Sequence, residues 1–370
     1  MSFIWQNPDW PLFKIKMQAI QPAYEKYLYQ KGLTDQVFSL ISPETRKVVY
    51  AQTITDDVVA SNEIEGISIS YDSVYSSVAR ALNIDNVLSK KQDKYSQILA
   101  QLALSIQEKE KVITEETILN WHKSLFDGAS PANRPNTIGG YRNGPVYVMS
   151  ISGSMKQEVL YEAVPAKEIQ KNMLALIKWI SDSADNFPLI VKSAIASMWF
   201  VSIHPFEDGN GRISRLLADA IMVQKDSNLK FYSVSSAILK NKKEYYKQLY
   251  DIQHSESMDA TQFVSWYINL VSDSLSVAEN TCKKKLSLSK FMASLDPSDF
   301  NSREISMLYR LASGNFYGKL TADKWSKLAK CQSATATRDL AHLVEKGLLI
   351  KSEEGGRASW YYLNDSVIDL

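Results

Sequence analysis

The chain has 370 residues, 45% of them hydrophobic, and a formal net charge of +1. This length allows two or three domains. The near-neutral charge excludes a global field that would draw the whole chain to nucleic acid or to an acidic membrane. Only two cysteines are present, Cys282 and Cys331, and neither has a Cys or His neighbour at metal-ligand spacing.

The amino terminus lacks the basic and apolar segments of a signal peptide. No stretch reaches the roughly 18 consecutive apolar residues of a membrane span. Two cysteines also make no disulfide framework, which favours a reducing compartment. We therefore expect a cytoplasmic protein without a membrane partner.

Residues 1–105 are predicted to form a helical domain. Its aromatic opening, with Trp5 and Trp10, is expected to pack on a later domain. Apolar residues at helical spacing then indicate a helix over 14–31. A second helix should begin at Pro43, since proline suits the first helical position.

This second helix, over about 45–66, ends in Ser61-Asn-Glu-Ile-Glu-Gly66. Ser61 and Glu65 are four residues apart and therefore share a face. Gly66 is typical of a residue that ends a helix. Taken alone, the segment is an ordinary helix end with a solvated acid.

Two β-prone runs, 146–151 and 156–161, flank a Gly/Ser turn and predict a β-hairpin. The first run begins with Val146, Tyr147, Val148 and Met149. A hairpin in an otherwise helical protein has exposed edges, so two interpretations stay open: a stabilising tab, or an edge that pairs with a partner strand. Upstream, His122 lies on the apolar face of a helix and is most simply a satisfied core histidine.

Residues 188–203 are apolar nearly all round, which predicts a buried helix that delivers His204 at its end. The sequence His204-Pro-Phe-Glu-Asp-Gly-Asn-Gly-Arg-Ile-Ser-Arg215 follows. Asp, Gly and Asn favour turns and caps, so 209–211 should be a tight loop before a new helix. Such a loop points free backbone N–H groups at an anion.

The side chains of this segment suit a phosphate site. Arg212 and Arg215 share one helix face and can both bind phosphate oxygens. Asp208 offers the hard oxygen ligand that Mg²⁺ prefers. His204 has a pKa near working pH and stands where a general base is wanted. Phe206 can anchor the loop to the core.

The segment matches the Fic-family motif H-x-F-x-[D/E]-G-N-G-R-x-x-R at every defined position. Those positions are His204, Phe206, Asp208, Gly209, Asn210, Gly211, Arg212 and Arg215. The chain therefore resembles a Fic enzyme. The resemblance implies transfer of AMP from ATP to a Ser, Thr or Tyr hydroxyl of a target protein, with self-modification as a further outcome. It makes Asp208 the Mg²⁺ ligand and the rest of the loop, with both arginines, the phosphate ligands.

The resemblance also gives the second helix a role, because Ser61-x-x-x-Glu65-Gly66 fits the family's inhibitory pattern, [S/T]-x-x-x-E-[G/N]. It implies that Glu65 pairs with Arg215. A carboxylate there removes a phosphate ligand and places negative charge where the γ-phosphate of ATP should lie. A small rotation of the helix would release it.

Two further segments gain roles from the same resemblance. The hairpin corresponds to the family's flap, which holds a target segment by strand addition. Tyr245 and Tyr246, in a helix predicted over 236–252, resemble the adenine-pocket segment, and aromatic rings can stack on a base. Plain packing is the alternative for both tyrosines.

Towards the carboxyl end, a helix is predicted over 259–275, followed by a polar connection from Cys282 to Asp296. Helices over 304–312, 321–330 and 333–346 and strands over 348–352 and 358–363 then suggest a winged helix. The charges within 333–346 sum to zero, whereas phosphate binding needs a basic surplus. DNA is therefore an unlikely partner, and a docking or oligomer-regulating module is favoured.

The predicted fold class is mainly α, in three parts. A helical amino-terminal domain spans 1–105, a helical Fic core with its hairpin flap spans 106–290, and a small winged-helix α+β domain spans 291–370. Three alternatives stay open: a hydrolase that removes AMP from protein with Glu65 orienting water, a DNA-binding regulator with a Fic sensor domain, and transfer of another group such as UMP. The resemblance also leaves a homodimer open.

Overall fold

The computed structural model describes residues 3–84, 93–107, 112–130, 134–149, 158–182, 187–224, 230–313, 316, 319–352, 359–364 and 366. The protein is mainly helical, as predicted, and forms two compact units. The first unit comprises Met1–Asp35 and Arg46–Ala278, and the second comprises Gln36–Thr45 and Glu279–Leu370. The three-part division made from the sequence stays a prediction.

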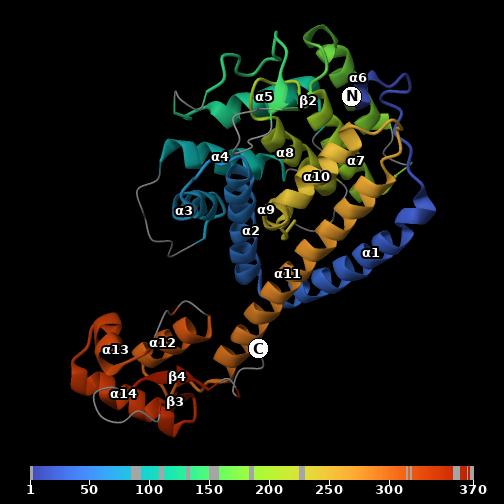
Figure 1. Ribbon diagram of the computed structural model, residues 1–370. Helices are drawn as coiled ribbons and strands as arrows, with labels where there is room; N and C mark the ends of the chain where they lie inside the picture. Colours follow the sequence, from blue (N-terminus) through green and yellow to red (C-terminus); the bar gives the residue numbers. More distant parts are fainter. Residues whose placement is uncertain are drawn as a thin grey trace. The chain divides into compact units, whose positions relative to one another are not determined.

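Figure 1 shows the elements in chain order. The first unit contains the short 3-10 helices η1 (Ile4–Gln6) and η3 (Ala166–Glu168), and α3 (Tyr71–Ala81), α4 (Lys94–Ser105), α5 (Glu115–Phe126), β1 (Tyr147–Met149), β2 (Val159–Glu162), α6 (Ile169–Asp182), α7 (Leu189–Ile203), α8 (Asn210–Val223), α9 (Val234–Lys240) and α10 (Lys242–Gln253). Helices α1 (Met17–Leu40), α2 (Pro43–Ile64) and α11 (Thr261–Ser294) lie mostly in it but include residues of the second unit. None of the helices within the described ranges combines the length and apolarity that a bilayer crossing needs.

Helix α7 is the centre of the first unit. Almost all of its side chains are buried, as its apolar sequence predicted, and it packs against α6 and α8 (Figure 1). Ile203 at its end and Phe206 in the following loop belong to one hydrophobic core with side chains of α2, α4, α5, α6 and α8. The loop after α7 is therefore anchored on a rigid, buried support.

The aromatic amino-terminal segment packs on later elements, as predicted. The Trp10 indole N–H donates to Asn172 Oδ1 of α6 at 2.6 Å, and its ring meets Trp199 of α7 edge-on at 6.2 Å. The Trp5 indole N–H donates to the carbonyl of Glu162 at the end of β2, at 2.7 Å. This segment thus stabilises the base of the hairpin and the outside of α7.

Helix α2 begins at Pro43 and ends at Ile64, which confirms the predicted start and end. Gly66 has a positive φ of 76°, and the N–H of Ile67 returns to the carbonyl of Asn62 at 3.0 Å. A left-handed glycine followed by such a bond ends helices routinely. The end of α2, which carries Ser61 and Glu65, is therefore fixed in direction.

A buried ionic cluster holds α2 to α8. Lys230 Nζ lies 2.7 Å from Asp57 Oδ2 of α2 and 3.0 Å from Asp219 Oδ1 of α8. All three side chains are buried. Asp57 also accepts from the Ser233 hydroxyl and the Ser235 N–H, at 2.7 and 3.1 Å. The cluster fixes the register of α2 against α8.

The predicted hairpin is present as the antiparallel pair β1 and β2, with Tyr147 opposite Glu162 and Val148 opposite Tyr161. Its register shifts between Val148 and Met149. The predicted turn, 152–154, lies outside the described residues. Tyr161 is buried, and its hydroxyl donates to the carbonyl of Ser202 near the end of α7 at 2.7 Å. The hairpin is therefore attached directly to the helix that carries the motif.

Two predictions about the helices need correction. The helix predicted over 236–252 is two helices, α9 and α10, which meet at Asn241. The polar connection expected from Cys282 is helical, because α11 continues to Ser294. Cys282, Leu288 and Phe291 are buried, so apolar residues at helical spacing continue beneath the lysines.

In the second unit, three helices are followed by an antiparallel hairpin, in the predicted order. The elements are α12 (Ser302–Ala312), α13 (Ala322–Ala329), α14 (Ser333–Glu345), β3 (Leu349–Lys351) and β4 (Tyr361–Leu363). Leu320, just before α13, forms an additional antiparallel bridge with Tyr361 of β4. Trp325, Leu340 and Leu343 are fully buried in this unit's own core.

Candidate active site

His204 is the residue that ends α7. It adopts a left-handed conformation, with φ 53° and ψ 60°, which is uncommon for a residue with a Cβ. Its Nδ1 lies 3.1 Å from the carbonyl of Val201. Because a carbonyl only accepts, Nδ1 must carry the proton, and Nε2 is left as an acceptor.

Burial lowers the pKa of the His204 imidazole to about 4. The ring is therefore neutral near pH 7, with its basic nitrogen at Nε2. Glu65 and Asp208 act in the opposite direction and Arg142 in the same direction as burial. This is the protonation state that a general base needs.

The loop after His204 leads into the amino terminus of α8. Gly209 has a φ of 84°, and a Cβ there would lie 3.0 Å from side-chain atoms of Leu125 and Phe126, so glycine is needed both for conformation and for space. The first turn of α8 leaves the N–H groups of Asn210, Gly211 and Arg212 without intrahelical partners. The helix therefore presents an anion site.

The structure specifies what Asn210 does in this loop. Its Oδ1 accepts from the N–H of Phe206 at 2.9 Å, and its Nδ2 donates to the carbonyl of Phe206 at 2.8 Å. The side chain closes the loop on itself and is buried. The main-chain N–H of Asn210 is left for a phosphate.

The two arginines of the motif are buried side chains of α8. Arg212 lies over the ring of Phe126, with 5.0 Å from Cζ to the ring centroid, and its Nη2 is 3.2 Å from Asp208 Oδ2. Arg212 Nε and Arg215 Nη1 have no hydrogen-bond partner among the described residues. Both guanidiniums therefore retain donor capacity for an anion.

Arg215 is held by the end of α2, an arrangement that the resemblance to Fic enzymes implied. Its Nη2 donates to Glu65 Oε1 at 2.8 Å and to the carbonyl of Ser61 at 2.7 Å, and its Nε donates to Ser61 Oγ at 2.9 Å. The Glu65 carboxylate also lies against Gly211, so closely that a Cβ on Gly211 would overlap Glu65 Oε1. A carboxylate thus occupies the anion site at the start of α8.

One pocket of about 760 Å³ brings together part of the predicted site; Asp208, Gly209, Asn210 and Arg212 are not among its lining residues. Its lining includes His204, Gly211, Arg215, Glu65, Gly66, Val148, Met149, Tyr245 and Tyr246. Ligand pockets typically enclose roughly 300–1,000 Å³, so a nucleotide fits. Val146 precedes β1 and is not among the lining residues, and Tyr147 is exposed on that strand.

The two tyrosines differ in their surroundings. Tyr245 is buried and stacks on Trp266, with 6.0 Å between ring centroids. Tyr246 is 43% exposed, with Lys242 Nζ 6.0 Å from its ring centroid. Tyr245 is therefore a packed wall of the pocket, and Tyr246 is the ring with a face left for a ligand.

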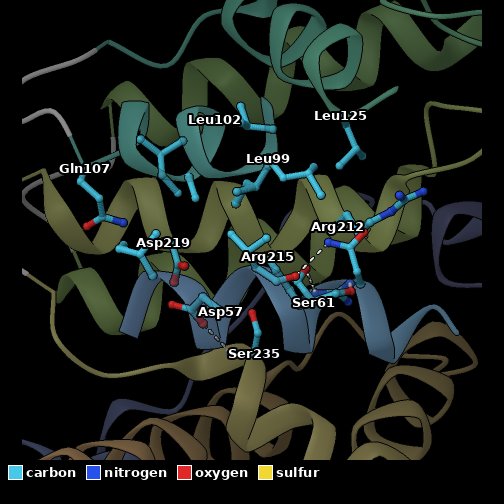
Figure 2. A pocket seen from close by; sticks show the side chains of 16 residues that line it. Asp57, Ser61, Leu99, Leu102, Gln107, Leu125, Arg212, Arg215, Asp219 and Ser235 are labelled. Atoms are coloured by element: carbon cyan, nitrogen blue, oxygen red, sulfur yellow. Dashed lines mark hydrogen bonds between the residues drawn. The ribbon is translucent and has the colours of Figure 1, made fainter. Parts of the chain in front are cut away.

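Figure 2 shows a second, smaller cavity behind the arginines, with Ser61 and Asp57 of α2 facing Arg215 and Asp219 of α8. Its volume is about 40 Å³. That is room for roughly one to three water molecules and not for a nucleotide. Of these two cavities, the larger pocket on the Glu65 side is the one with room for a nucleotide.

Asp208 has the properties of a carboxylate that binds Mg²⁺ in sites where the ion also contacts substrate phosphates. Its carboxylate is 55% exposed, and its Oδ1 accepts the Gly209 N–H at 2.6 Å. Within the described ranges, no three His, Cys, Asp or Glu side chains are grouped to hold a metal. Mg²⁺ typically takes one or two carboxylates and completes its shell with phosphates and water. A single exposed carboxylate beside an anion site fits that mode.

Two positioning residues complete the site. His122, predicted to be a satisfied core histidine, accepts the Gly139 N–H at Nδ1 (3.0 Å), so its Nε2 donates to the carbonyl of Asp208 (3.1 Å). Arg142 had no predicted role, yet its guanidinium is buried on three main-chain carbonyls. A lone arginine in a Gly- and Asn-rich loop carries no sequence pattern that reveals such contacts.

Comparison with known proteins agrees with this geometry. Residues 112–222 match the model of the Fic/DOC family, and residues 3–84 match a domain of unknown function, DUF4172. A probable protein adenylyltransferase from Aquifex aeolicus is 26% identical over 172 residues, covering 46% of this chain and 48% of the relative. A protein adenylyltransferase Fic from Nematostella vectensis is 27% identical over 160 residues, covering 43% and 33%. The chain thus spans about half or less of the curated relatives it matches.

The fold has a counterpart among solved structures. A Fic family protein from Desulfovibrio desulfuricans superposes with a TM-score of 0.55 at 22% identity, covering 96% of this chain and 98% of that one. At this identity the likeness speaks for the fold. Together with the match over 112–222, it shows that this chain carries a Fic domain, with the motif 204–215 near its carboxyl end.

Proposed function

We propose that the protein is a protein adenylyltransferase, which moves AMP from ATP to a Ser, Thr or Tyr hydroxyl of a target protein. One observation carries the proposal: His204, with a free Nε2, lines the same pocket as the anion site of Gly211 and Arg215. A base beside a triphosphate site is the arrangement that phosphoryl-type transfer requires. The names of the relatives in Aquifex and Nematostella agree with it.

In the proposed reaction, the target hydroxyl gives its proton to Nε2 of His204. The hydroxyl oxygen of the target then bonds to the α-phosphorus of ATP. The bond from that phosphorus to the oxygen that bridges the α- and β-phosphates breaks, and pyrophosphate leaves. The N–H groups of the first turn of α8, with Arg212 and Arg215, orient the phosphates and stabilise their charge. Most of the rate enhancement would come from positioning and electrostatics, with about 10²–10⁴-fold from the base.

Asp208 is proposed as the protein ligand of Mg²⁺. When bound, the ion would supply positive charge that offsets the charge of the phosphates. The carbonyl of Asp208 is held by His122 and its Oδ1 by the Gly209 N–H. Oδ2 contacts Arg212, so the carboxylate is oriented by the protein before any metal arrives.

Autoinhibition by Glu65 is part of the proposal. The Glu65 carboxylate binds the Arg215 guanidinium and lies against Gly211. A phosphate of ATP would need the same guanidinium and the same place beside Gly211. Two anions cannot share one guanidinium and one helix terminus without strong repulsion. ATP could then bind productively only after Glu65 withdraws, and the left-handed Gly66 that follows gives the chain a place to turn.

The flap is the proposed binding site for the target. Tyr147, Val148 and Met149 of β1 are all exposed, and Val148 and Met149 also line the pocket. An exposed strand edge binds an extended segment through main-chain hydrogen bonds, with little demand on its sequence. A target segment paired with β1 would place a hydroxyl near His204.

The test compares wild type, Glu65→Gly, and Glu65→Gly combined with His204→Ala, each incubated with α-labelled ATP and Mg²⁺. Label on protein should be weak in wild type, strong in Glu65→Gly and absent from the double variant. A cell lysate supplies targets if self-modification is slow. If Glu65→Gly takes up no label from ATP, with or without lysate, the transferase proposal fails; labelled UTP then tests the UMP alternative.

The reverse reaction is the second candidate, because the Glu65 carboxylate lines the pocket that contains His204. A carboxylate in that position can orient water towards the phosphorus of an AMP-modified hydroxyl. Release of AMP from a pre-modified protein by wild type, lost in Glu65→Gly, would favour the hydrolase. Net gain of label by Glu65→Gly together with no release by wild type favours the transferase.

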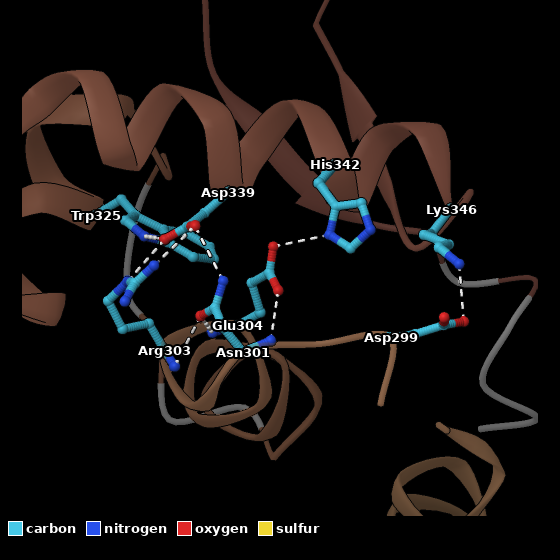
Figure 3. A network of polar contacts seen from close by, with 8 residues as sticks. All are labelled: Asp299, Asn301, Arg303, Glu304, Trp325, Asp339, His342 and Lys346. Atoms are coloured by element: carbon cyan, nitrogen blue, oxygen red, sulfur yellow. Dashed lines mark hydrogen bonds and ion pairs between the residues drawn. The ribbon is translucent and has the colours of Figure 1, made fainter. Parts of the chain in front are cut away.

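We further propose that the second unit is a winged-helix module that docks protein. The Leu320–Tyr361 bridge beside the β3–β4 hairpin supports the winged-helix interpretation. Figure 3 shows Asp339 of α14 turned inward onto Arg303, Asn301 and Trp325. The solvent-facing charges of α14 are therefore Arg338, Glu345 and Lys346, and Lys346 is paired with Asp299 at 2.7 Å. So small a surplus speaks against DNA, and a salt-dependent gel shift with duplex DNA would overturn the docking proposal.

A further inference from the structure

We propose that Arg142 is a positioning residue that joins the flap to the catalytic histidine, because its guanidinium binds main-chain carbonyls at both ends of the hairpin and at His204. The inference rests on the proposed function, since it assigns a role in the same reaction. It concerns a residue outside the motif, the inhibitory helix and the nucleotide pocket.

The contacts of Arg142 come from three segments of the chain. Its Nε donates to the carbonyl of His204 at 2.8 Å, its Nη1 to that of Gly144 at 2.6 Å, and its Nη2 to that of Val164 at 2.5 Å. Its main-chain N–H also donates to the carbonyl of Pro205 at 3.0 Å. A planar guanidinium fixes the relative position of the groups it binds.

Two of these carbonyls lie at the base of the hairpin. Gly144 precedes β1, and Val164 follows β2. Between them, the Ala163 N–H donates to the carbonyl of Val146 at 3.1 Å, as the first rung of the hairpin. Arg142 therefore closes the hairpin from below, and any displacement of its guanidinium moves both strands.

The third carbonyl belongs to a strained residue. His204 has left-handed backbone angles, which are strained for a residue that is not glycine. Its N–H is tied to the carbonyl of Phe200 at 3.0 Å, and its C=O is tied to Arg142. Holding the two peptide units on either side of the His204 Cα keeps the imidazole aimed into the pocket.

The charge of Arg142 has its own effect. The side chain is 2% exposed, and the guanidinium contacts found in the described chain are to carbonyls. A buried positive charge beside an imidazole disfavours the imidazolium. Arg142 thus acts in the same direction as burial, which is the larger cause of the lowered His204 pKa.

Other ionisable groups face His204 from every neighbouring element. Glu65 of α2 and Asp208 of the motif loop favour the imidazolium. The remaining groups on the pocket wall are Arg215 of α8, Tyr161 of β2, and Lys242, Tyr245, Tyr246 and Tyr250 of α10. These groups are common to the wild type and to both Arg142 variants, so the comparison of Arg142→Gln with Arg142→Lys, which keeps the positive charge, assigns a change in the His204 titration to the charge of Arg142.

The experiment separates charge from geometry with two variants and a control. Arg142→Gln removes the charge and most of the donors, whereas Arg142→Lys keeps the charge but cannot reach three carbonyls at once. Arg134→Gln is the matched control, since Arg134 is an exposed arginine in the same loop segment. The chain has four histidines, so histidine-labelled protein allows each imidazole to be titrated by NMR, with His204→Asn assigning the signal.

In Arg142→Gln, the His204 pKa should rise by on the order of one unit; in Arg142→Lys and Arg134→Gln it should stay at the wild-type value. Both Arg142 variants should exchange the Ala163 amide faster. In the Glu65→Gly background both should lose on the order of 10²-fold in label transfer, as misplaced groups do. The Arg134→Gln control should keep the wild-type exchange of the Ala163 amide and the wild-type rate of label transfer.

A folded Arg142→Gln protein with wild-type His204 titration would overturn the electrostatic role. If that variant does not fold, Arg142→Lys decides, because wild-type amide exchange at Ala163 with wild-type transfer would overturn the positioning role. The titration and the exchange need no enzymatic turnover. The titration and the amide exchange therefore still test the role of Arg142 if no variant transfers label. Such a failure to transfer label would count only against the proposed adenylyltransferase function.

Discussion

Glu65 and Arg215, 150 residues apart in sequence, are joined by a hydrogen-bonded ion pair of 2.8 Å. Arg215 is buried, and the Glu65 carboxylate is only partly exposed. The pair connects the end of α2 to the first turns of α8. Its position on Gly211 makes the contact a competitor of any anion that binds α8.

Gly211→Ala should therefore differ from Glu65→Gly. A methyl group at this position overlaps the Glu65 carboxylate, so the ion pair should break, but the methyl also fills the place of a phosphate. We expect ATP affinity to stay weak, in contrast to a gain in Glu65→Gly, as measured by isothermal titration calorimetry. Gly144→Ala is the control, since a Cβ there meets no atom within 4 Å. ATP binding by Gly211→Ala as tight as by Glu65→Gly would contradict the proposed phosphate position.

Ser61→Ala should weaken the inhibition without abolishing it. The hydroxyl oxygen accepts from Arg215 Nε at 2.9 Å, and one such bond contributes about 1 kcal/mol. Basal label transfer should rise roughly 5-fold, well below the gain in Glu65→Gly. Ser68→Ala removes an exposed hydroxyl just after the helix and should leave transfer unchanged. Equal rates for wild type and Ser61→Ala would show that Ser61 does not hold the arginine in place.

Lys230→Met should lower the free energy of unfolding by about 3–5 kcal/mol, because it leaves Asp57 and Asp219 buried without their cation. Urea denaturation measures the loss. Adding Asp57→Asn and Asp219→Asn should recover most of it, since no buried charge is then unpaired. Lys247→Met removes one partner of an exposed pair and should leave the free energy of unfolding close to that of the wild type. A loss that persists in the triple variant would assign the effect to packing.

Stability should fall in mild acid because of two buried histidines. Burial lowers the pKa of both His122 and His204 to about 4, whereas an unfolded histidine titrates near 6.5. Between these values the unfolded chain binds protons that the folded chain does not, so stability decreases as pH falls from about 6.5 to 4. The contribution is on the order of 3 kcal/mol for His122.

Urea midpoints measured at pH 7, 5.5 and 4.5 test this dependence. His122→Gln should be less stable at pH 7, because two hydrogen bonds are lost, but its stability should depend less steeply on pH. His254→Gln changes a partly exposed histidine and serves as the comparison. Parallel pH curves for wild type and His122→Gln would contradict the assignment of a neutral, buried His122.

The local geometry of the candidate site could be predicted from the sequence where its residues are contiguous. The residues that shape the motif 204–215 lie within it. Its glycines allow the tight loop, Asn210 is hydrogen-bonded to the main chain of Phe206, and the two arginines lie about one helical turn apart. The pairing of Glu65 with Arg215 came from the family pattern and is present in the structure. No periodicity within α2 would have revealed it, because the partner lies on another helix.

What escaped prediction depends on contacts distant in sequence. Arg142 meets His204 across 62 residues and Lys230 meets Asp57 across 173. Asp339 was counted as a surface charge of its helix, yet it is buried against Arg303 and Trp325 (Figure 3). The lysines at 283–285 suggested a linker because they dominate the local composition, whereas the buried Cys282 and Leu288 keep α11 helical.

The amino-terminal segment has a consequence for the order of folding. Trp5 and Trp10 bind Glu162 and Asn172, 157 and 162 residues later in the chain, and the carbonyl of Lys14 accepts the N–H of Ala260. At roughly 5–20 residues per second of synthesis, these tryptophans wait on the order of ten seconds or more for their partners. Trp5 and Trp10 can therefore pack only after residues 162 and 172 have been made. During that interval the two indole side chains, one destined for the base of the flap and the other for α6 and α7, stay exposed to chaperones and to other nascent chains.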